Sequence, residues 1–248
     1  MLKHTLLIVV ASIALAACNE PAGDDVASTL SPEAPLTNQA LPMAQSEPTE
    51  VAIQVAQADA SSFELGTHYQ MLTPTQPTSS GPDQVEVAEI FWYGCPHCFA
   101  FEPYLEAWRP TAASYVSFVR IPAVWNPTLR LHAQAFYTAE VLGMGTEMHR
   151  PIFDEIQVNG NFLDSEQKLA AFFERFGVTA EEFEKAFNSF TVHTKLERAD
   201  ELNRRYRISS VPSIVINGKY TSNGTMAGSY ERLIELVDEL AAREHSNH

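Results

Sequence analysis

Two of the chain's three cysteines, Cys95 and Cys98, are separated by Pro96 and His97 and form a CxxC motif. Two cysteines at this spacing occur in structural zinc sites, in haem-attachment sites and in sites of dithiol redox chemistry. A structural zinc site needs four ligands, and the sequence has neither a second CxxC nor a histidine pair at zinc-finger spacing. Haem attachment needs a histidine directly after the second cysteine, where this chain has Phe99. The motif therefore favours redox chemistry with no metal and no cofactor beyond its own disulfide.

The elements around the motif are expected to place it at the start of a helix. An apolar run over 85–93 predicts a strand that ends at Gly94, and the apolar spacing that follows predicts a helix over 95–108. Pro96 suits the first turn of that helix, where an N–H group would have no partner. Pro103 is expected to bend the helix, because it removes an internal hydrogen bond.

A cysteine at a helix N-terminus faces unpaired backbone N–H groups and the positive end of the helix dipole, and both favour its thiolate. His97 adds a donor or a positive charge, while Cys98 lies one turn into the helix. Cys95 is thus predicted to be the nucleophile and Cys98 the resolving cysteine. A stabilised thiolate stabilises the reduced form, so the disulfide is expected to be an oxidant.

The remaining pattern indicates an α/β protein. It predicts strands over 115–121, 213–216 and 219–221, several helices between 129 and 190, and further helices over 192–206 and 230–243. Asn217-Gly218 is typical of a hairpin turn. The order is therefore a βαβ unit, a helical insertion and a ββα unit. We expect residues 63–125 and 192–248 to form one domain and residues 126–191 to form the insertion.

The stretch from Glu89 to Cys98, EIFWYGCPHC, resembles the active site of the DsbA family of thiol–disulfide oxidoreductases. The resemblance extends over about 63–243 and includes Val211-Pro212-Ser213. It implies a thioredoxin fold with an inserted α-helical domain.

Carried onto this sequence, the resemblance implies that Pro212 forms a cis peptide bond facing the CxxC motif. The backbone of Val211 would then bind an extended peptide. Glu89 would be a buried acid that moves protons on and off Cys98. From its position alone, Glu89 fits a surface acid at a strand edge equally well, so both interpretations stay open.

The N-terminus is predicted to be a lipoprotein signal. Residues 1–17 have a charged start and an apolar run too short to span a bilayer, and they end at Cys18. This resembles a bacterial lipobox, so Cys18 is expected to be lipidated and to anchor the chain to a membrane in the periplasm of a Gram-negative bacterium. Asn19 weakly favours the outer membrane. Cleavage after Ala16, which would leave Cys18 a free thiol, is the alternative. Residues 18–62 would form a flexible acidic and proline-rich tether.

Composition excludes other classes. A net charge of −15 argues against nucleic acid as a partner, because phosphate binding needs clustered lysine and arginine. The sequence contains no G-x-S-x-G motif, so nothing in it indicates a serine hydrolase with a nucleophile elbow. The isolated histidines are interpreted as surface or hydrogen-bonded core residues, and they are His68, His132, His149 and His193. Phenylalanines between 153 and 190 are expected to form the core of the insertion.

The predicted function is a monomeric dithiol oxidase that donates the Cys95–Cys98 disulfide to unfolded or newly exported cysteine-containing proteins. The resemblance implies re-oxidation by a DsbB-like membrane quinone reductase, a meeting that an outer-membrane anchor would hinder. A reductase or isomerase of the same fold is the main alternative, although the N-terminal segment does not resemble an isomerase dimerisation domain. A non-catalytic thiol or metal-binding module is a further alternative, against which the lack of a nearby Met/His cluster counts.

Overall fold

The structure is a computed structural model that describes residues 61–247. The predicted signal sequence, Cys18 and the predicted tether up to residue 60 lie outside the described residues. Within 61–247, no helix combines the length and the apolar character that crossing a membrane requires.

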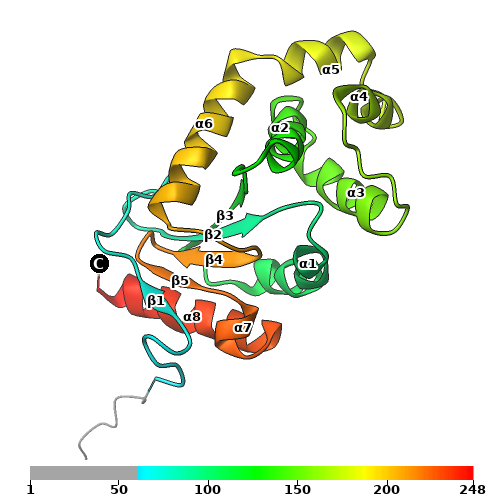
Figure 1. The fold of residues 1–248 in the computed structure, drawn as a ribbon. Coiled ribbons are helices and arrows are strands. Elements are labelled where there is room, and N and C mark those ends of the chain that lie inside the picture. The colour runs from blue at the N-terminus through cyan, green and yellow to red at the C-terminus, as the bar shows by residue number, and fades with distance from the viewer. Residues whose placement is uncertain (1–60, 248) are drawn as a thin grey trace, which may run out of the picture. The chain divides into compact units, whose positions relative to one another are not determined.

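A five-stranded mixed sheet lies at the centre of the described region (Figure 1). Its strands are β1 (Gln70–Met71), β2 (Val85–Phe91), β3 (Val116–Pro122), β4 (Ser213–Ile216) and β5 (Tyr220–Ser222). They are ordered β1-β5-β4-β2-β3, with β2 and β3 parallel and the other neighbours antiparallel. Strand β2 is buried along its whole length, because helices cover both of its faces. Its end therefore has a fixed position, and the CxxC motif follows that end.

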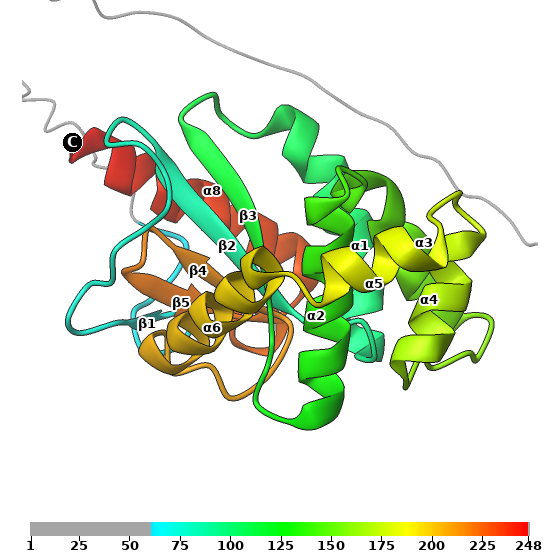
Figure 2. The ribbon, with the colours of Figure 1, turned by 90° about the horizontal axis from the view of Figure 1, so that it is seen from above.

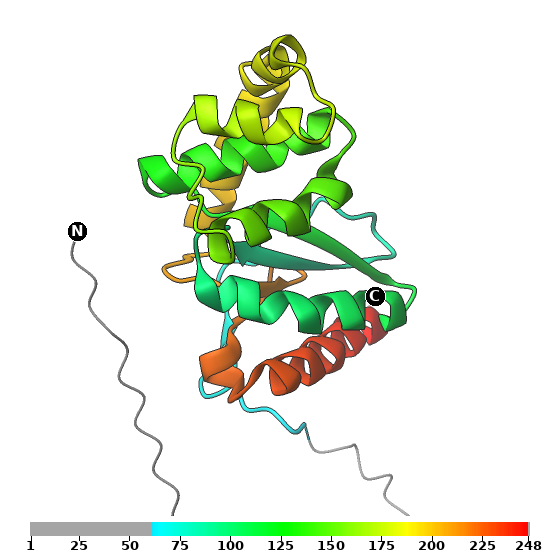
Figure 3. The same cartoon turned by 90° about the vertical axis from the view of Figure 1, so that its right-hand side faces the viewer.

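One face of the sheet is covered by α1 (Pro96–Trp108) and α8 (Tyr230–Ser246), which lie side by side (Figure 3). The 3₁₀ turn η1 (Arg109–Thr111) extends α1, and α7 (Gly224–Ala227) precedes α8. Alternate residues of β2 point to this face and join a core cluster that includes Val85, Val87, Phe101, Leu105, Leu236 and Leu240.

The other face carries the helical segment. Its members are α2 (Pro127–Val141), α3 (Gly145–Gln157), α4 (Glu166–Glu174), α5 (Ala180–Phe187) and α6 (Phe190–Arg205). Seen from above, α6 crosses over the sheet, while α2 to α5 lie over the side that holds α1 (Figure 2). A second core cluster fills the space between these helices and the sheet, and it includes Ala88, Ile90, Phe136, Phe153, Phe173 and Phe183.

Side chains that accept hydrogen bonds from backbone N–H groups explain where several helices begin. Asn126 accepts from Leu129 N at the start of α2. Thr179 and Glu182 bond to each other's backbone at the start of α5. Such contacts satisfy N–H groups that have no partner within the helix.

The predicted order of βαβ unit, helical insertion and ββα unit is confirmed. Strand β2 ends at Phe91, two residues earlier than predicted, because the chain turns there and Cys95 N donates to Trp92 O at 3.0 Å. Three short elements were not predicted: β1 with 2 residues, the 3₁₀ turn η1 with 3 residues and α7 with 4 residues. Elements this short have too few residues to show a period. The domain limits at 125–126 and 191–192 stay predictions, and α6 passes the second limit as one continuous helix.

Candidate active site

The CxxC motif lies where the loop after β2 enters α1. Cys95 directly precedes the helix and Cys98 lies in its first turn. Both are free thiols, and their side chains differ in access, since Cys95 is 8 % exposed and Cys98 is 0 % exposed. A substrate sulfur can therefore approach only Cys95 from solvent.

The loop before β4 lies opposite the motif. The Cys95 thiol donates a long hydrogen bond of 3.5 Å to the carbonyl oxygen of Val211. The Val211–Pro212 peptide bond is cis, as the family resemblance implied. Two segments more than a hundred residues apart thus meet at one sulfur atom.

The two thiols titrate in opposite directions. A hydrogen bond from the Cys98 thiol is the largest of the effects that lower the pKa of Cys95 to about 6. The backbone N–H groups of Cys98 and His97 and the charge of His97 act in the same direction, and burial opposes them. Burial raises the pKa of Cys98 well above its ordinary value, and the neighbouring Cys95 adds to this. The reduced pair therefore holds one thiolate and one thiol near neutral pH.

Glu89 is fully buried in β2, so the alternative of a surface acid is wrong. Its Oε2 accepts from Arg120 Nε at 3.0 Å, whereas its Oε1 has no hydrogen-bond partner among the described residues. Burial and then the charge of Glu102 raise the pKa of Glu89 to about 8, although Arg120 opposes both effects. The charge of Glu89 in turn raises the pKa of Cys98. A carboxyl group able to exchange a proton at neutral pH thus lies within electrostatic reach of the buried thiol.

Arg120 and Glu102 complete this buried network, and sequence reasoning did not find them. Arg120 Nη2 donates to Glu102 Oε2 at 2.8 Å and to the more exposed Glu106 at 2.9 Å. One signal was present, because Arg120 interrupts an apolar run in the strand predicted beside Glu89. In the observed register the two residues are direct partners across β2 and β3.

The predicted histidine environments are observed. The buried His132 accepts from the partly buried Trp92 Nε1 at 2.9 Å, and His149 bonds to Tyr93 and Glu102 within the core. His68 accepts from a backbone N–H and His193 is exposed.

A hollow of about 600 Å³ opens beside the motif. His97, Val211 and Pro212 line one side of it, and residues from α7 and the start of α8, including Tyr230 and Glu231, line the other. The Tyr230 hydroxyl donates to the carbonyl oxygen of His97 at 3.0 Å and so ties α8 to the motif. The missed element α7 therefore forms part of a cleft next to Cys95.

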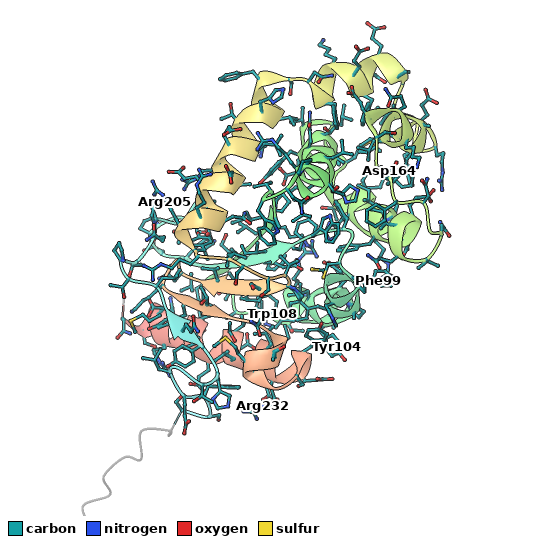
Figure 4. The ribbon with its side chains drawn as sticks, in the orientation of Figure 1. Phe99, Tyr104, Trp108, Asp164, Arg205 and Arg232 are labelled. Atoms are coloured by element: carbon teal, nitrogen blue, oxygen red, sulfur yellow. The ribbon has the colours of Figure 1, made fainter. Side chains whose placement is uncertain are left out.

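The side chains of α1 connect this site to both cores. Phe99 projects from α1 toward α3, while Tyr104 and Trp108 lie on the side that faces α7 and α8 (Figure 4). Pro103 lies inside α1, as predicted.

Comparison with known proteins identifies the family. The family model of a DSBA-like thioredoxin domain matches residues 110–237. The thiol:disulfide interchange protein DsbA of Pseudomonas syringae pv. tomato is 38 % identical over 187 residues, which covers 75 % of this chain and 87 % of that protein. The DsbA of Azotobacter vinelandii is 37 % identical over 202 residues, covering 76 % and 94 %.

Solved structures agree. The crystal structure of Pseudomonas aeruginosa DsbA superposes with a TM-score of 0.71 at 35 % identity, covering 75 % of this chain and 96 % of that one. The shared fold and identities above a third over most of the chain lead to one conclusion: this chain belongs to the DsbA family and is a thiol–disulfide oxidoreductase with a thioredoxin fold and a helical insert.

Proposed function

We propose that this protein is a periplasmic dithiol oxidase that passes the Cys95–Cys98 disulfide to newly exported cysteine-containing proteins. A substrate thiolate attacks Cys95 Sγ, the Cys95–Cys98 bond breaks, and Cys98 leaves as a thiolate that takes a proton. A second substrate thiolate then attacks the substrate sulfur of the mixed disulfide and releases the Cys95 thiolate. The substrate loses two electrons and the enzyme gains them.

The observation that carries this proposal is the opposite titration of the two thiols. Because the pKa of Cys95 is lowered to about 6, Cys95 is a good leaving group in the second step. Stabilisation of its thiolate also favours the reduced enzyme, so the disulfide tends to move to the substrate.

Glu89 is proposed to supply the proton that Cys98 takes. Its raised pKa of about 8 keeps it protonated at neutral pH, and once it is ionised its charge raises the pKa of Cys98. Once Glu89 has given up that proton, Arg120 compensates the carboxylate. Re-oxidation of the pair would return the proton to Glu89.

The cleft between the motif and α7 is proposed to hold the substrate peptide. Val211 precedes the cis bond at Pro212, and its backbone faces Cys95. An extended peptide can pair with that backbone as an added strand, which brings its sulfur to Cys95. Pairing through the backbone suits varied substrates, because it does not depend on side chains.

For location and partners we keep the expectations from the sequence. The chain is proposed to act as a monomer that is anchored to a membrane through a lipid on Cys18, with the outer membrane weakly favoured. It is proposed to be re-oxidised by a DsbB-like quinone reductase. If that reductase lies in the inner membrane, the tether must let the domain reach it.

The reduction potential of the Cys95–Cys98 pair, measured by equilibration with glutathione, tests the direction of transfer. An oxidase is expected near the DsbA value of about −120 mV, and a value near that of thioredoxin, about −270 mV, would instead favour a reductase. Cys98→Ala provides a second test: its Cys95 thiolate attacks the disulfide of a disulfide-linked peptide and releases one peptide thiolate, and the mixed disulfide should accumulate because it can no longer resolve within the enzyme.

A further inference from the structure

His149 joins the helical insert to the redox helix through two hydrogen bonds. From α3, its Nε2 bonds to Glu102 Oε1 of α1 at 3.0 Å, and its Nδ1 bonds to the Tyr93 hydroxyl at 3.1 Å. The side chain is buried among aromatic rings, which are those of Phe91, Phe136 and Phe153. The mechanism proposed above makes no use of this buried titratable group.

The contacts assign the proton on the imidazole. An ionised Glu102 can only accept, and beside it Nε2 carries the proton while Nδ1 accepts from the Tyr93 hydroxyl. Burial lowers the pKa of His149, although Glu102 opposes this effect, and the neutral ring is therefore the stable form. His149 thus presents one fixed donor to Glu102.

The Arg120 guanidinium is the shared partner of the carboxyl groups in this network. Arg120 donates to Glu89, Glu102 and Glu106, of which the first two are buried. The other charged side chains at the rim of the two adjoining pockets are Arg109, Glu140, Arg150 and Lys195. They pair with other partners at that rim, as Arg109–Glu106, Arg150–Asp154 and Lys195–Glu140. Two buried carboxyl groups therefore depend on one buried cation.

The charge of Glu102 raises the pKa of Glu89, and where two carboxyl groups interact in this way, a proton favours the one with fewer hydrogen-bond donors. Glu102 has donors on both oxygens, from His149 and Arg120. Glu89 has Arg120 alone, and its Oε1 is without a partner among the described residues. The shared proton is therefore placed on Glu89.

We propose that His149 is a positioning residue for the redox reaction: its donor keeps Glu102 ionised as the partner of Arg120, which leaves the exchangeable proton on Glu89 for Cys98. This proposal rests on the role of Glu89 in the proposed function. It gives the helical insert a part in proton transfer, because α3 supplies the group that decides which carboxyl group is protonated.

The test follows the Glu89 carboxyl group by ¹³C NMR in the oxidised full chain, with Glu89→Gln to assign the signal. His149→Met removes the donor and keeps a similar length, so the proton should move to Glu102 and the Glu89 midpoint should fall by about one pH unit or more. His149→Gln keeps an N–H near the Nε2 position, and its Glu89 midpoint should stay close to that of the wild type.

Glu102→Gln separates this role from a merely structural one. It removes the competing carboxyl group, so adding His149→Met to it should cause no further shift at Glu89. If His149→Met does not fold, His149→Asn replaces it, since its shorter amide does not reach Glu102.

An unchanged or raised Glu89 midpoint in His149→Met, or an equal fall in His149→Gln, overturns the proposal. Because the oxidised protein has no free thiol in the motif, this result is independent of the direction of disulfide transfer. A failed reduction-potential test would remove the oxidase proposal and leave this measurement intact.

Discussion

Cys95 and Cys98 lie one helical turn apart, and their surroundings favour opposite protonation states. Cys95 faces backbone N–H groups and His97 at the N-terminal end of α1, and these lower its pKa. Cys98 is buried in the core, and burial together with the charge of an ionised Glu89 raises its pKa. At the scale of single residues, the chemistry is set by which groups each sulfur faces.

His97→Ser is expected to raise the pKa of Cys95 from about 6, because it removes the charge of His97 that favours the thiolate. The reduction potential should fall by about 30 mV for each unit of that rise. Thiolate absorbance at 240 nm against pH gives the first value, and equilibration with glutathione gives the second. His193→Ser, at an exposed position on α6, is the matched control. An unchanged thiolate midpoint in His97→Ser would contradict the expectation.

Glu89→Gln is expected to stabilise the oxidised protein in a pH-dependent way. The pKa of Glu89 is raised to about 8 in the fold, compared with about 4.3 in an unfolded chain. Its contribution to stability is therefore fully present below pH 4.3 and is lost as the pH rises through about 8. Glutamine stays neutral, so the variant should gain stability over the wild type between about pH 5 and pH 9.

Urea unfolding of Glu89→Gln and of the wild type at about pH 5 and pH 9 measures the gain in stability, with Glu147→Gln on the exposed side of α3 as the control. Changes in packing that do not depend on the ionisation of Glu89 shift the variant's stability equally at both ends of the range. The informative quantity is therefore the change with pH, and a constant difference would count against a raised pKa.

The turn between β2 and α1 is held by the helical insert. Trp92 Nε1 donates to His132 of α2, and Gln157 of α3 donates to the carbonyl oxygen of Tyr93 at 2.8 Å. A Cβ atom on Gly94 would lie 2.2 Å from the Trp92 indole. At the scale of elements, glycine here lets the indole fold back over the turn and reach His132.

Gly94→Ala is expected to destabilise the protein by about 1–3 kcal/mol, because the indole must leave its position and its hydrogen bond. Urea unfolding gives the change in free energy, and tryptophan fluorescence reports the altered indole. Gly81→Ala is the matched control, since its Cβ would meet nothing within 4 Å and its φ is not in the left-handed region. Equal stability of the two variants would show that the contact does not matter.

The sequence predicted elements better than it predicted contacts between them. The strand, Gly94 and Pro96 were enough to place the CxxC motif at a helix start, because those signals are local. Arg120 and His149 act through partners on other elements, so no period or spacing in their own segments shows their role. The burial of Glu89 likewise depends on α1 covering β2, which a single strand pattern cannot reveal.

Seen as a whole, the described region places one redox pair at the meeting point of two cores. Cys95 and Cys98 belong to the cluster shared with the helical insert, while Phe101 and Leu105, further along α1, belong to the cluster shared with α8. A change at the motif therefore acts on packing on both sides of the sheet.

The stability of the whole protein is expected to depend on its redox state. The pKa of Cys95 is lowered to about 6 in the fold, compared with about 8.5 in an unfolded chain. The resulting stability of the reduced form is full above about pH 8.5 and is lost as the pH falls through about 6. Unfolding of reduced and oxidised protein across this range should show a difference that grows with pH, and a flat difference would contradict the lowered pKa.

Cys18→Ser tests the proposed anchor. The variant should leave the membrane fraction of expressing cells and lose incorporation of labelled palmitate, because its sulfur is the proposed site of acylation. Disulfide transfer by the purified variant should match that of the wild type, because residue 18 is far in sequence from the CxxC motif and from the residues predicted to form the thioredoxin-like domain. A variant that still incorporates palmitate would refute lipidation at Cys18.

The start of α1 has one more consequence. The side chain of Cys95, the N-cap residue of α1, makes no capping hydrogen bond in the structure, and the first turn contains no acidic residue. Missing N-caps typically cost a helix about 1 kcal/mol. A Cys95 thiolate, which exists only when the Cys95–Cys98 disulfide is reduced, would serve as that cap. Reduction of the pair would then complete the start of α1, and re-oxidation would remove the cap again.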